Sequence, residues 1–447
     1  MKRLLSAILM SLLAVSLFAG GQSEEKQVSS QSMENETEVK EIQFWYAFSD
    51  DKRSGWIKGL AEEWNASQSE YKIIAEPKGS YRETLQASVL ASRQGVAPHL
   101  VHIFEVGSQL ALDSGIFEPI GNVGTFDTSD YIEPVLNYYT LDGTVNSIPF
   151  NSSSPILYTN RDMMKQAGLD PSNPPRTFEE ILAACEQAKA AGVENAGLGF
   201  NVHGWFFEQW LAQQGAPIVN NGNGRDGRAT ETMLDSTESK KIFGFIKELN
   251  DKGFYKYTGK LEDWGGSDAI FQEGQVMFHI TSTADLGNIT SAINGRFEMG
   301  TGMLPIPGDS DRNGVVIGGA SVWLTKGHPM DEMEAARDFI LFLTNTDNMI
   351  DWHKMTGYYP VRNSSVDKLE NDGWFAEAPT RTIAFTQLLE TVPNQATAGG
   401  VMGTFGDTRT IVEEAIQKIL NGADVDAAAE EAKKLADLKL IEYNKNF

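Results

Sequence analysis

The first sixty residues after position 41 alternate between two hydrophobic periods. Three short apolar runs are typical of β-strands: residues 42–46, 71–74 and 100–104. The gaps between them have helical character, with bulky apolar residues at every fourth position from Trp56 to Trp64 and a helical pattern over residues 82–94. This strand–helix order favours a largely parallel sheet covered by helices.

A second unit with the same character is expected after Pro155. Residues 156–159 predict a strand, and residues 161–167 predict a short helix that stops at Gly168. Thr177 and Glu180 form a capping box that starts another helix. Further helices are expected at residues 240–252, 330–343, 410–420 and 425–443. We therefore predict two α/β lobes, with a ligand site in the crevice between them.

The chain has 447 residues and a net charge of −24, which together limit its size class and its partners. This length suggests two or three compact units. Such a negative field repels nucleic acids and anionic lipid surfaces, so we expect neither as a partner. An anionic ligand would need positive charge placed locally inside a cleft.

The N-terminus has the pattern of an export signal. Residues 1–21 combine a charged start, an apolar stretch from Leu4 to Phe18 and small residues at the exit. Residues 22–41 are polar and rich in Ser and Glu, which predicts a disordered tether. Gly21 stands where a lipoprotein signal would have Cys, so we expect soluble release outside the cytoplasm, without a lipid anchor.

Several short motifs match cofactor or metal sites, but the residues around them do not fit such sites. Residues 222–227 match G-x-G-x-x-G, but a polar segment follows where a dinucleotide site needs a helix. Residues 309–314 resemble the start of an EF-hand loop, whose twelfth position here is Ala320. His99 and His102 have no accompanying metal-binding pattern, and Cys185 is the only cysteine. We predict no cofactor, no metal and no enzymatic activity, although the many carboxylates leave a glycosidase-type pair open.

Residues 156–171, followed by 175–178, resemble the signature stretch of family 1 extracellular solute-binding proteins of ABC importers. Further segments resemble the members of that family that bind sn-glycerol 3-phosphate: residues 78–81, 104–107, 149–155, 317–321, 352–358 and 408–412. The similarity extends from about residue 42 to residue 435. The resemblance implies a two-lobed periplasmic-binding-protein fold of the class II type, with a hinge between the lobes.

Carried over residue by residue, the resemblance implies a cleft lined by Tyr81, Glu105, Ser153, Trp205, Ser282, Gly319, Tyr358 and Arg409. Arg409 would offer a planar fork of donors to a phosphate, and Glu105 would accept from the hydroxyls of a glycerol end. A purely structural role remains open for each of these residues. The aromatic residues could be core, the two serines could cap turns, and Arg409 could pair with Glu413.

One position departs from the family pattern. The glycerol phosphate binders carry two tryptophans with two residues between them. Here Val202 stands in the place of the first tryptophan, and Trp205 is the second. Loss of an indole opens space, so we include Val202 in the predicted site. The hypothesis is that the pocket accepts a longer glycerophosphodiester, such as glycerophosphocholine, as well as or instead of the monoester. His203 could also touch the ligand.

The predicted organisation assigns residues 42–152 and 286–343 to lobe 1, and residues 153–285 and 344–447 to lobe 2. The expected function is solute capture by hinge closure for an ABC importer, with a permease in the cytoplasmic membrane as partner and the binding protein itself a monomer. The alternatives are a binder of oligosaccharides or polyols and a secreted phosphodiester hydrolase. The hydrolase would need a metal or a nucleophile that the sequence does not display.

Overall fold

The computed structural model describes residues 39–141 and 143–447. The predicted signal peptide and nearly all of the predicted tether lie outside these residues. Within them, no helix has the length and apolar character needed to cross a bilayer.

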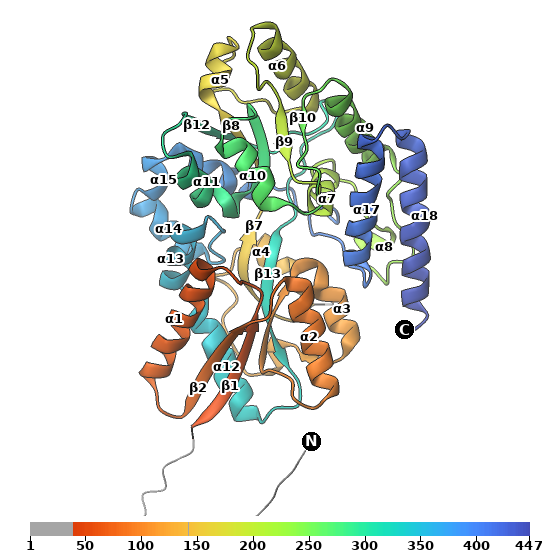
Figure 1. The fold of residues 1–447 in the computed structure, drawn as a ribbon. Coiled ribbons are helices and arrows are strands. Elements are labelled where there is room, and N and C mark those ends of the chain that lie inside the picture. The colour runs from red at the N-terminus through yellow and green to blue at the C-terminus, as the bar shows by residue number, and fades with distance from the viewer. Residues whose placement is uncertain (1–38, 142) are drawn as a thin grey trace, which may run out of the picture. The chain divides into compact units, whose positions relative to one another are not determined.

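The first sheet has the strand order β2-β1-β3-β13-β4, with β7 also paired to β13 (Figure 1). Its strands are β1 Lys40–Tyr46, β2 Tyr71–Pro77, β3 Leu100–Phe104, β4 Phe117–Glu118, β7 Ile148–Ser153 and β13 Gly318–Thr325. The strands β1, β2 and β3 are parallel, as predicted, and β13 pairs antiparallel with β3. A strand from near residue 320 therefore completes a sheet that the N-terminal third begins.

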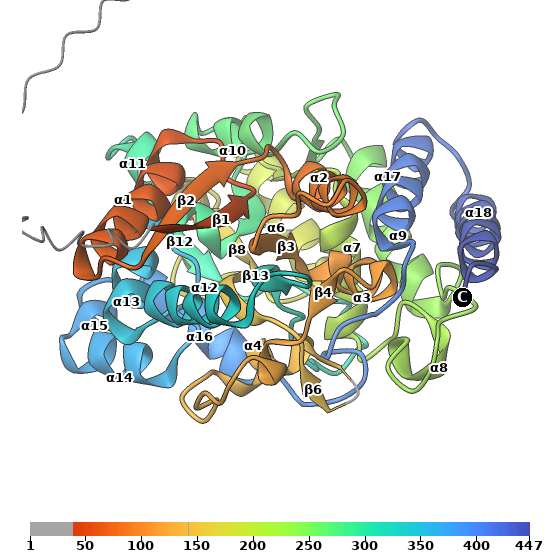
Figure 2. The same ribbon diagram turned by 90° about the horizontal axis from the view of Figure 1, so that it is seen from below.

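Helices cover both faces of this sheet. On one face lie α1 Asp51–Ser67 and α12 Met330–Leu343, and on the other lie α2 Tyr81–Arg93 and α3 Ser108–Ser114 (Figure 2). Ser80 and Glu83 form a capping box that fixes the start of α2, so Tyr81 is its first residue. The apolar positions predicted on α1 face the core as expected, since Leu60 is buried in the core of the first sheet and Trp56 and Trp64 pack against it.

The second sheet has the order β10-β9-β11-β8-β12. Its strands are β8 Pro155–Asn160, β9 Leu198–Phe200, β10 Tyr255–Lys256, β11 Phe278–Ser282 and β12 Met299–Gly302. The largest core packs against one face, with the helices α5 Arg161–Gln166, α6 Phe178–Ala190, α7 Gly204–Gln213, α9 Thr237–Asp251, α17 Phe405–Leu420 and α18 Val425–Asn444. The other face is covered by α10 Trp264–Gln272 and α11 Leu286–Ile293.

Shorter elements connect these layers. They are α4 Glu133–Tyr138, the hairpin of β5 Thr140–Leu141 and β6 Thr144–Val145, α8 Asn220–Asn223, α13 Thr346–Thr356, α14 Asn363–Asn371, α15 Trp374–Glu377, α16 Thr382–Leu389, and the 3-10 turns η1 Glu105–Gly107, η2 Ile120–Asn122, η3 Thr283–Asp285 and η4 Pro379–Arg381. The G-x-G-x-x-G match falls on α8, where Asn221 to Gly224 all have left-handed φ angles. It is a tight turn with no helix behind it.

The two-sheet α/β architecture is confirmed, but two stretches lie elsewhere than expected. The strand β12 was assigned to lobe 1, and it pairs antiparallel with β8 of the second sheet. Trp352, Tyr359 and Phe385 were assigned to lobe 2, and they are buried in the core of the first sheet. An apolar pattern shows that an element has a buried face, and it does not say which sheet that face covers. The lobe boundaries otherwise stay predictions.

Candidate functional site

Arg409 lies in the second turn of α17, with only 8% of its surface exposed. Its Nε donates to Glu208 Oε1 at 2.7 Å, and its Nη2 donates to Glu208 Oε2 at 2.9 Å. The same Nη2 donates to Glu105 Oε1 at 2.6 Å. The alternative pairing with Glu413 is wrong, because Glu413 accepts the backbone N–H of Gly204 instead.

The two carboxylates reach Arg409 from different cores. Glu105 follows β3 directly, at the carboxyl end of a parallel strand, where ligands of α/β sheets bind. Its second oxygen accepts the backbone N–H of Gly319 in β13 at 3.2 Å. Glu208 lies on α7, in the core of the second sheet. Arg409 thus ties the end of the first sheet to the helices that cover the second.

One cation faces two carboxylates here, so the group carries an excess of negative charge. Burial raises the pKa of Glu208, against the effect of the neighbouring guanidinium. Burial opposes the charge of Arg409 as well, but Glu208 and Glu105 raise its pKa above the ordinary value. The two N–H groups of Nη1 have no hydrogen-bond partner in the described part of the chain. They form the edge of the guanidinium that a bound anion could use.

Tyr81 and Tyr358 form an aromatic wall on the first sheet. The ring of Tyr81 stacks on Phe104 at 5.7 Å, and its hydroxyl accepts from the amide of Asn151 at 3.0 Å. Tyr358 stacks on Trp352, also at 5.7 Å between ring centroids. Burial raises the pKa of both phenols, so both remain protonated donors at neutral pH.

Two charged residues beside this wall were not predicted from the sequence as site residues. The guanidinium of Arg53 lies 4.5 Å from the ring of Phe48, which also contacts Tyr81 and Tyr358. Burial raises the pKa of Asp285 to about 7, and Arg53 acts in the opposite direction. Arg53 sits in the first turn of an ordinary amphipathic helix and Asp285 ends a 3-10 turn, so neither position carries a motif.

The predicted serines end two strands, one in each sheet. Ser153 is the last residue of β7 and lies opposite Gly318 of β13. Ser282 is the last residue of β11, and its hydroxyl accepts the N–H of Ala284 at 3.1 Å. Ser282 therefore has the turn-capping role considered for it. Both residues are buried.

Trp205 packs against the backbone of β13. A Cβ at Gly318 would lie 2.6 Å from the indole, so only glycine admits this contact. The indole N–H is buried and has no hydrogen-bond partner among residues 39–141 and 143–447. A buried donor without a partner marks a place where a ligand or water belongs. Gly319, the next residue, has φ +117° and needs glycine for its backbone conformation.

Val202 and His203 directly precede α7, the helix that carries Trp205. The side chain of Val202 has no exposed surface and belongs to the core of the second sheet. His203 caps α7, accepting the N–H of Trp205 at Nδ1 at 3.0 Å, and its ring lies 5.0 Å from that of Trp264. The part of Val202 in binding stays a prediction.

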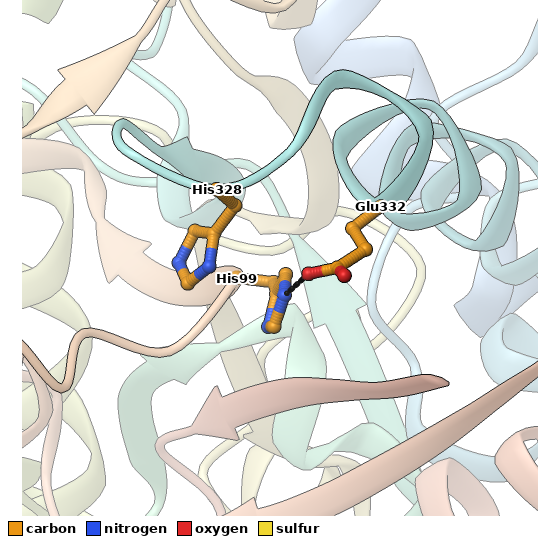
Figure 3. A group of neighbouring side chains, drawn as sticks. All are labelled: His99, His328 and Glu332. Carbon is orange, nitrogen blue, oxygen red and sulfur yellow. Dashed lines mark hydrogen bonds and ion pairs between the residues drawn. The ribbon is translucent and has the colours of Figure 1, made fainter. Parts of the chain in front are cut away.

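Two side-chain clusters have the composition of metal sites: His99 with His328 and Glu332, and His203 with Glu262 and Glu413. Figure 3 shows the first cluster, where Nε2 of His99 lies 3.1 Å from Glu332. Nδ1 of His99 accepts the backbone N–H of Gln43, so the proton of the neutral ring sits on Nε2. Nδ1 of His203 accepts a backbone N–H in the same way. In His99 this tautomer presents Nε2–H to Glu332, which favours hydrogen bonding over metal coordination.

A family model described as bacterial extracellular solute-binding protein matches residues 59–383. The sn-glycerol-3-phosphate-binding periplasmic protein UgpB of Escherichia coli O6:H1 (strain CFT073) is 31% identical over 400 residues, covering 87% of this chain and 90% of that protein. UgpB of Salmonella typhimurium is 32% identical over 396 residues, covering 86% and 88%.

Solved structures share the fold at lower identity. The cyclic alpha-maltosyl-1,6-maltose binding protein from Arthrobacter globiformis aligns with a TM-score of 0.74 at 22% identity, covering 90% of this chain and 99% of that chain. UgpB from Mycobacterium tuberculosis in complex with glycerophosphocholine gives the same TM-score and identity, covering 90% and 98%.

Proposed function

Because this chain belongs to the bacterial extracellular solute-binding proteins, we propose that it captures sn-glycerol 3-phosphate or a glycerophosphodiester for an ABC importer. These relatives are periplasmic binding proteins by name. The arrangement of Arg409 carries the proposal for the solute. A buried guanidinium with one open edge lies beside polar groups from both sheets.

The open edge of Arg409 suits a phosphate. Its Nε and Nη2 already hold Glu208 and Glu105, which orients the planar group and leaves Nη1 for the ligand. The two N–H groups of Nη1 point in different directions, so each would donate a separate charge-assisted hydrogen bond to the ligand. The unpartnered indole N–H of Trp205 could donate to a further oxygen.

The charge balance around Arg409 favours a diester over a monoester. Two carboxylates lie within hydrogen-bond distance of the one cation. A phosphomonoester brings nearly two negative charges at neutral pH, and a diester brings one. Repulsion between like charges about 4 Å apart costs on the order of 4 kcal/mol near a protein surface. A glycerophosphodiester such as glycerophosphocholine therefore binds at a smaller electrostatic cost.

Closure of the two lobes would supply the binding mechanism. Glu105, Gly319 and Tyr81 lie on the first sheet, and Trp205 and Arg409 lie on helices of the second. A solute that contacts both groups gains its full binding energy only when they approach, so it shifts the population toward the closed state.

Titration calorimetry with sn-glycerol 3-phosphate, glycerophosphocholine and maltotriose tests the proposal. We expect heat from a phosphate compound, with the diester binding more tightly. Arg409→Lys keeps the charge but loses the planar fork, and it should weaken binding at least about tenfold. Arg161→Lys, at an exposed pair with Glu298, is the matched control and should bind like wild type. Heat from maltotriose alone would contradict the proposal.

A neutral oligosaccharide is the second candidate, favoured by one observation. The charge of Arg409 is already met by two carboxylates, which can accept hydrogen bonds from sugar hydroxyls. Aromatic faces such as those of Tyr81, Trp205 and Tyr358 suit sugar rings equally well. For this class of solute, inorganic phosphate should not compete with binding.

A further inference from the structure

The C-terminal helix α18 has apolar residues on two opposite faces. Its inner face is formed by Ala428, Ala429, Ala432, Ala436 and Leu440, which pack against α17 and α9. On the outer face Leu435, Leu438 and Ile441 are 38%, 55% and 51% exposed. Figure 1 shows α18 at the edge of the second sheet's helices, with α17 on its inner side. Three large apolar side chains clustered on an outer face mark an interaction surface.

A groove runs beside this stripe. It has a volume of about 360 Å³ and is lined by Leu438 and Ile441 together with charged residues of α18 and Asp235. The stripe and the groove lie next to one another, so one helix face offers both apolar side chains and a hollow to receive such side chains. A surface of this kind can pack against a copy of itself.

The outer face is also symmetric in sequence about Leu438. Three residues to either side stand Leu435 and Ile441, both apolar. Four residues to either side stand Lys434 and Glu442, which have opposite charge. Seven residues to either side stand Glu431 and Lys445, again opposite in charge and, like the rest, exposed.

We propose that α18 packs antiparallel against α18 of a second copy of this chain, with a two-fold axis at Leu438. In that arrangement each residue lies at the same height as its counterpart across the axis. Leucine meets leucine at the centre, Leu435 and Ile441 flank it, and the charged pairs follow. The outer pair, Glu431 with Lys445, lies about 10 Å from the axis at 1.5 Å per residue. A parallel pairing would place like charges opposite one another.

The intrachain contacts of these residues do not oppose the pairing. Glu431 bonds to Lys418 and Glu442 to Lys445, but all four side chains are about half exposed or more. Exposed ion pairs of this kind contribute little to stability, so replacing the intrachain partner by an intermolecular one costs little free energy. Lys434 has no ion-pair partner within 4.0 Å in the part of the chain that is described.

The small area of the proposed contact between the two α18 helices predicts weak association. One helix face buries less than the roughly 800 Å² per partner of a standard stable interface. The dimer should therefore form in a concentration-dependent manner, where the sequence alone suggested a monomer. It requires no solute, so its success or failure is independent of the proposed ligand.

Crosslinking of Leu438→Cys tests the symmetry axis. A cysteine on a two-fold axis meets its own copy, and a disulfide needs Cβ atoms about 3.8 Å apart. The native Cys185 is buried and does not compete. With a mild oxidant the purified Leu438→Cys protein should form disulfide-linked dimers at least about tenfold faster than Leu389→Cys, a control whose native side chain is more exposed, at 72% against 55% for Leu438. Equal rates for the two variants would overturn the proposal.

Charge exchange tests the antiparallel register. Lys434→Glu places two acidic groups at one height, and sedimentation should show at least about tenfold weaker dimerisation. The double variant Lys434→Glu with Glu442→Lys restores opposite charges across the axis and should recover dimerisation. Thermal melting of the same samples checks that each variant is folded. A double variant that stays as weak as Lys434→Glu would overturn the antiparallel pairing.

Discussion

The guanidinium of Arg409 lies 2.6 Å from the carboxylate of Glu105, although 304 positions separate them in the chain. Glu105 ends a strand of the first sheet, and Arg409 belongs to a helix that covers the second. The pair therefore sits at the junction of the two cores, where a solute would have to enter. A change in this ion pair should therefore affect both the stability of the fold and the predicted binding site.

Removal of Arg409 should destabilise the protein as well as the site. Arg409→Met leaves Glu105 and Glu208 buried with no cation between them, and breaking a buried pair in this way costs about 3–5 kcal/mol. Glu208→Gln leaves Arg409 paired with Glu105 and should cost less than half as much. Urea unfolding followed by circular dichroism measures both. Equal losses for the two variants would show that the guanidinium does not neutralise both acids.

Stability should fall as the pH rises toward neutrality because of Glu413. Burial raises the pKa of Glu413 to about 7, with Glu262 and Glu208 adding to the effect and the Gly204 N–H and Arg409 opposing it. The folded state thus binds this proton more tightly than the unfolded chain, whose glutamates titrate near pH 4.3. The contribution of the protonated form is complete below pH 4 and is lost as the pH rises through about 7.

The substitution Glu413→Gln isolates that titration. The amide oxygen can still accept from Gly204, but no charge forms, so the variant should be about 1–3 kcal/mol more stable than wild type at pH 8. The difference should shrink toward zero near pH 4.5. Glu414→Gln, on the exposed side of the same helix, should show no such pH dependence. A constant difference across this range would rule out the titration of Glu413 as its cause.

Local elements were predictable from the sequence because their signals are local. The capping box of Thr177 and Glu180 starts α6, and the pattern over residues 330–343 coincides with α12. Neither partner of Arg409 was predicted as one: Glu105 belonged to the expected site as an acceptor for solute hydroxyls, and Glu208 did not belong to it. No spacing rule relates positions 208 and 409, because only the folded arrangement of α7 and α17 brings them together. The same holds for Arg53 and Asp285 beside Tyr358.

Asp113 is the hub of a second contact between the cores. Both its oxygens bind the guanidinium of Arg228, at 2.8 and 2.9 Å, and one also accepts from the hydroxyl of Tyr443 at 2.8 Å. Asp113 lies on α3 of the first sheet, and Tyr443 is near the end of α18. If this contact breaks when the lobes separate, it stabilises the closed state without touching the solute.

The substitution Asp113→Asn should raise the Kd for the solute about threefold to tenfold, because the closed form loses its ion pair and becomes less populated. Calorimetry with glycerophosphocholine measures the change. Glu118→Gln, which alters an exposed carboxylate on the same sheet bonded to Asn122, should leave the Kd unchanged. An unchanged Kd in Asp113→Asn would mean that the contact survives in both conformations, on the hinge side of the molecule.

The indole of Trp205 packs closely against Gly318. A methyl group at position 318 would lie 2.6 Å from the indole, so Gly318→Ala must push the ring away from β13. The backbone of Gly318 itself does not require glycine, since its φ is outside the left-handed region, and the damage should be confined to the indole. Solute affinity should fall at least about tenfold, with a shift in tryptophan fluorescence. Gly244→Ala, in open space on α9, should leave affinity intact and raise stability by about 0.5–1 kcal/mol. Full affinity in Gly318→Ala would remove Trp205 from the binding site, since a displaced indole could no longer hold the ligand that its buried N–H is proposed to meet.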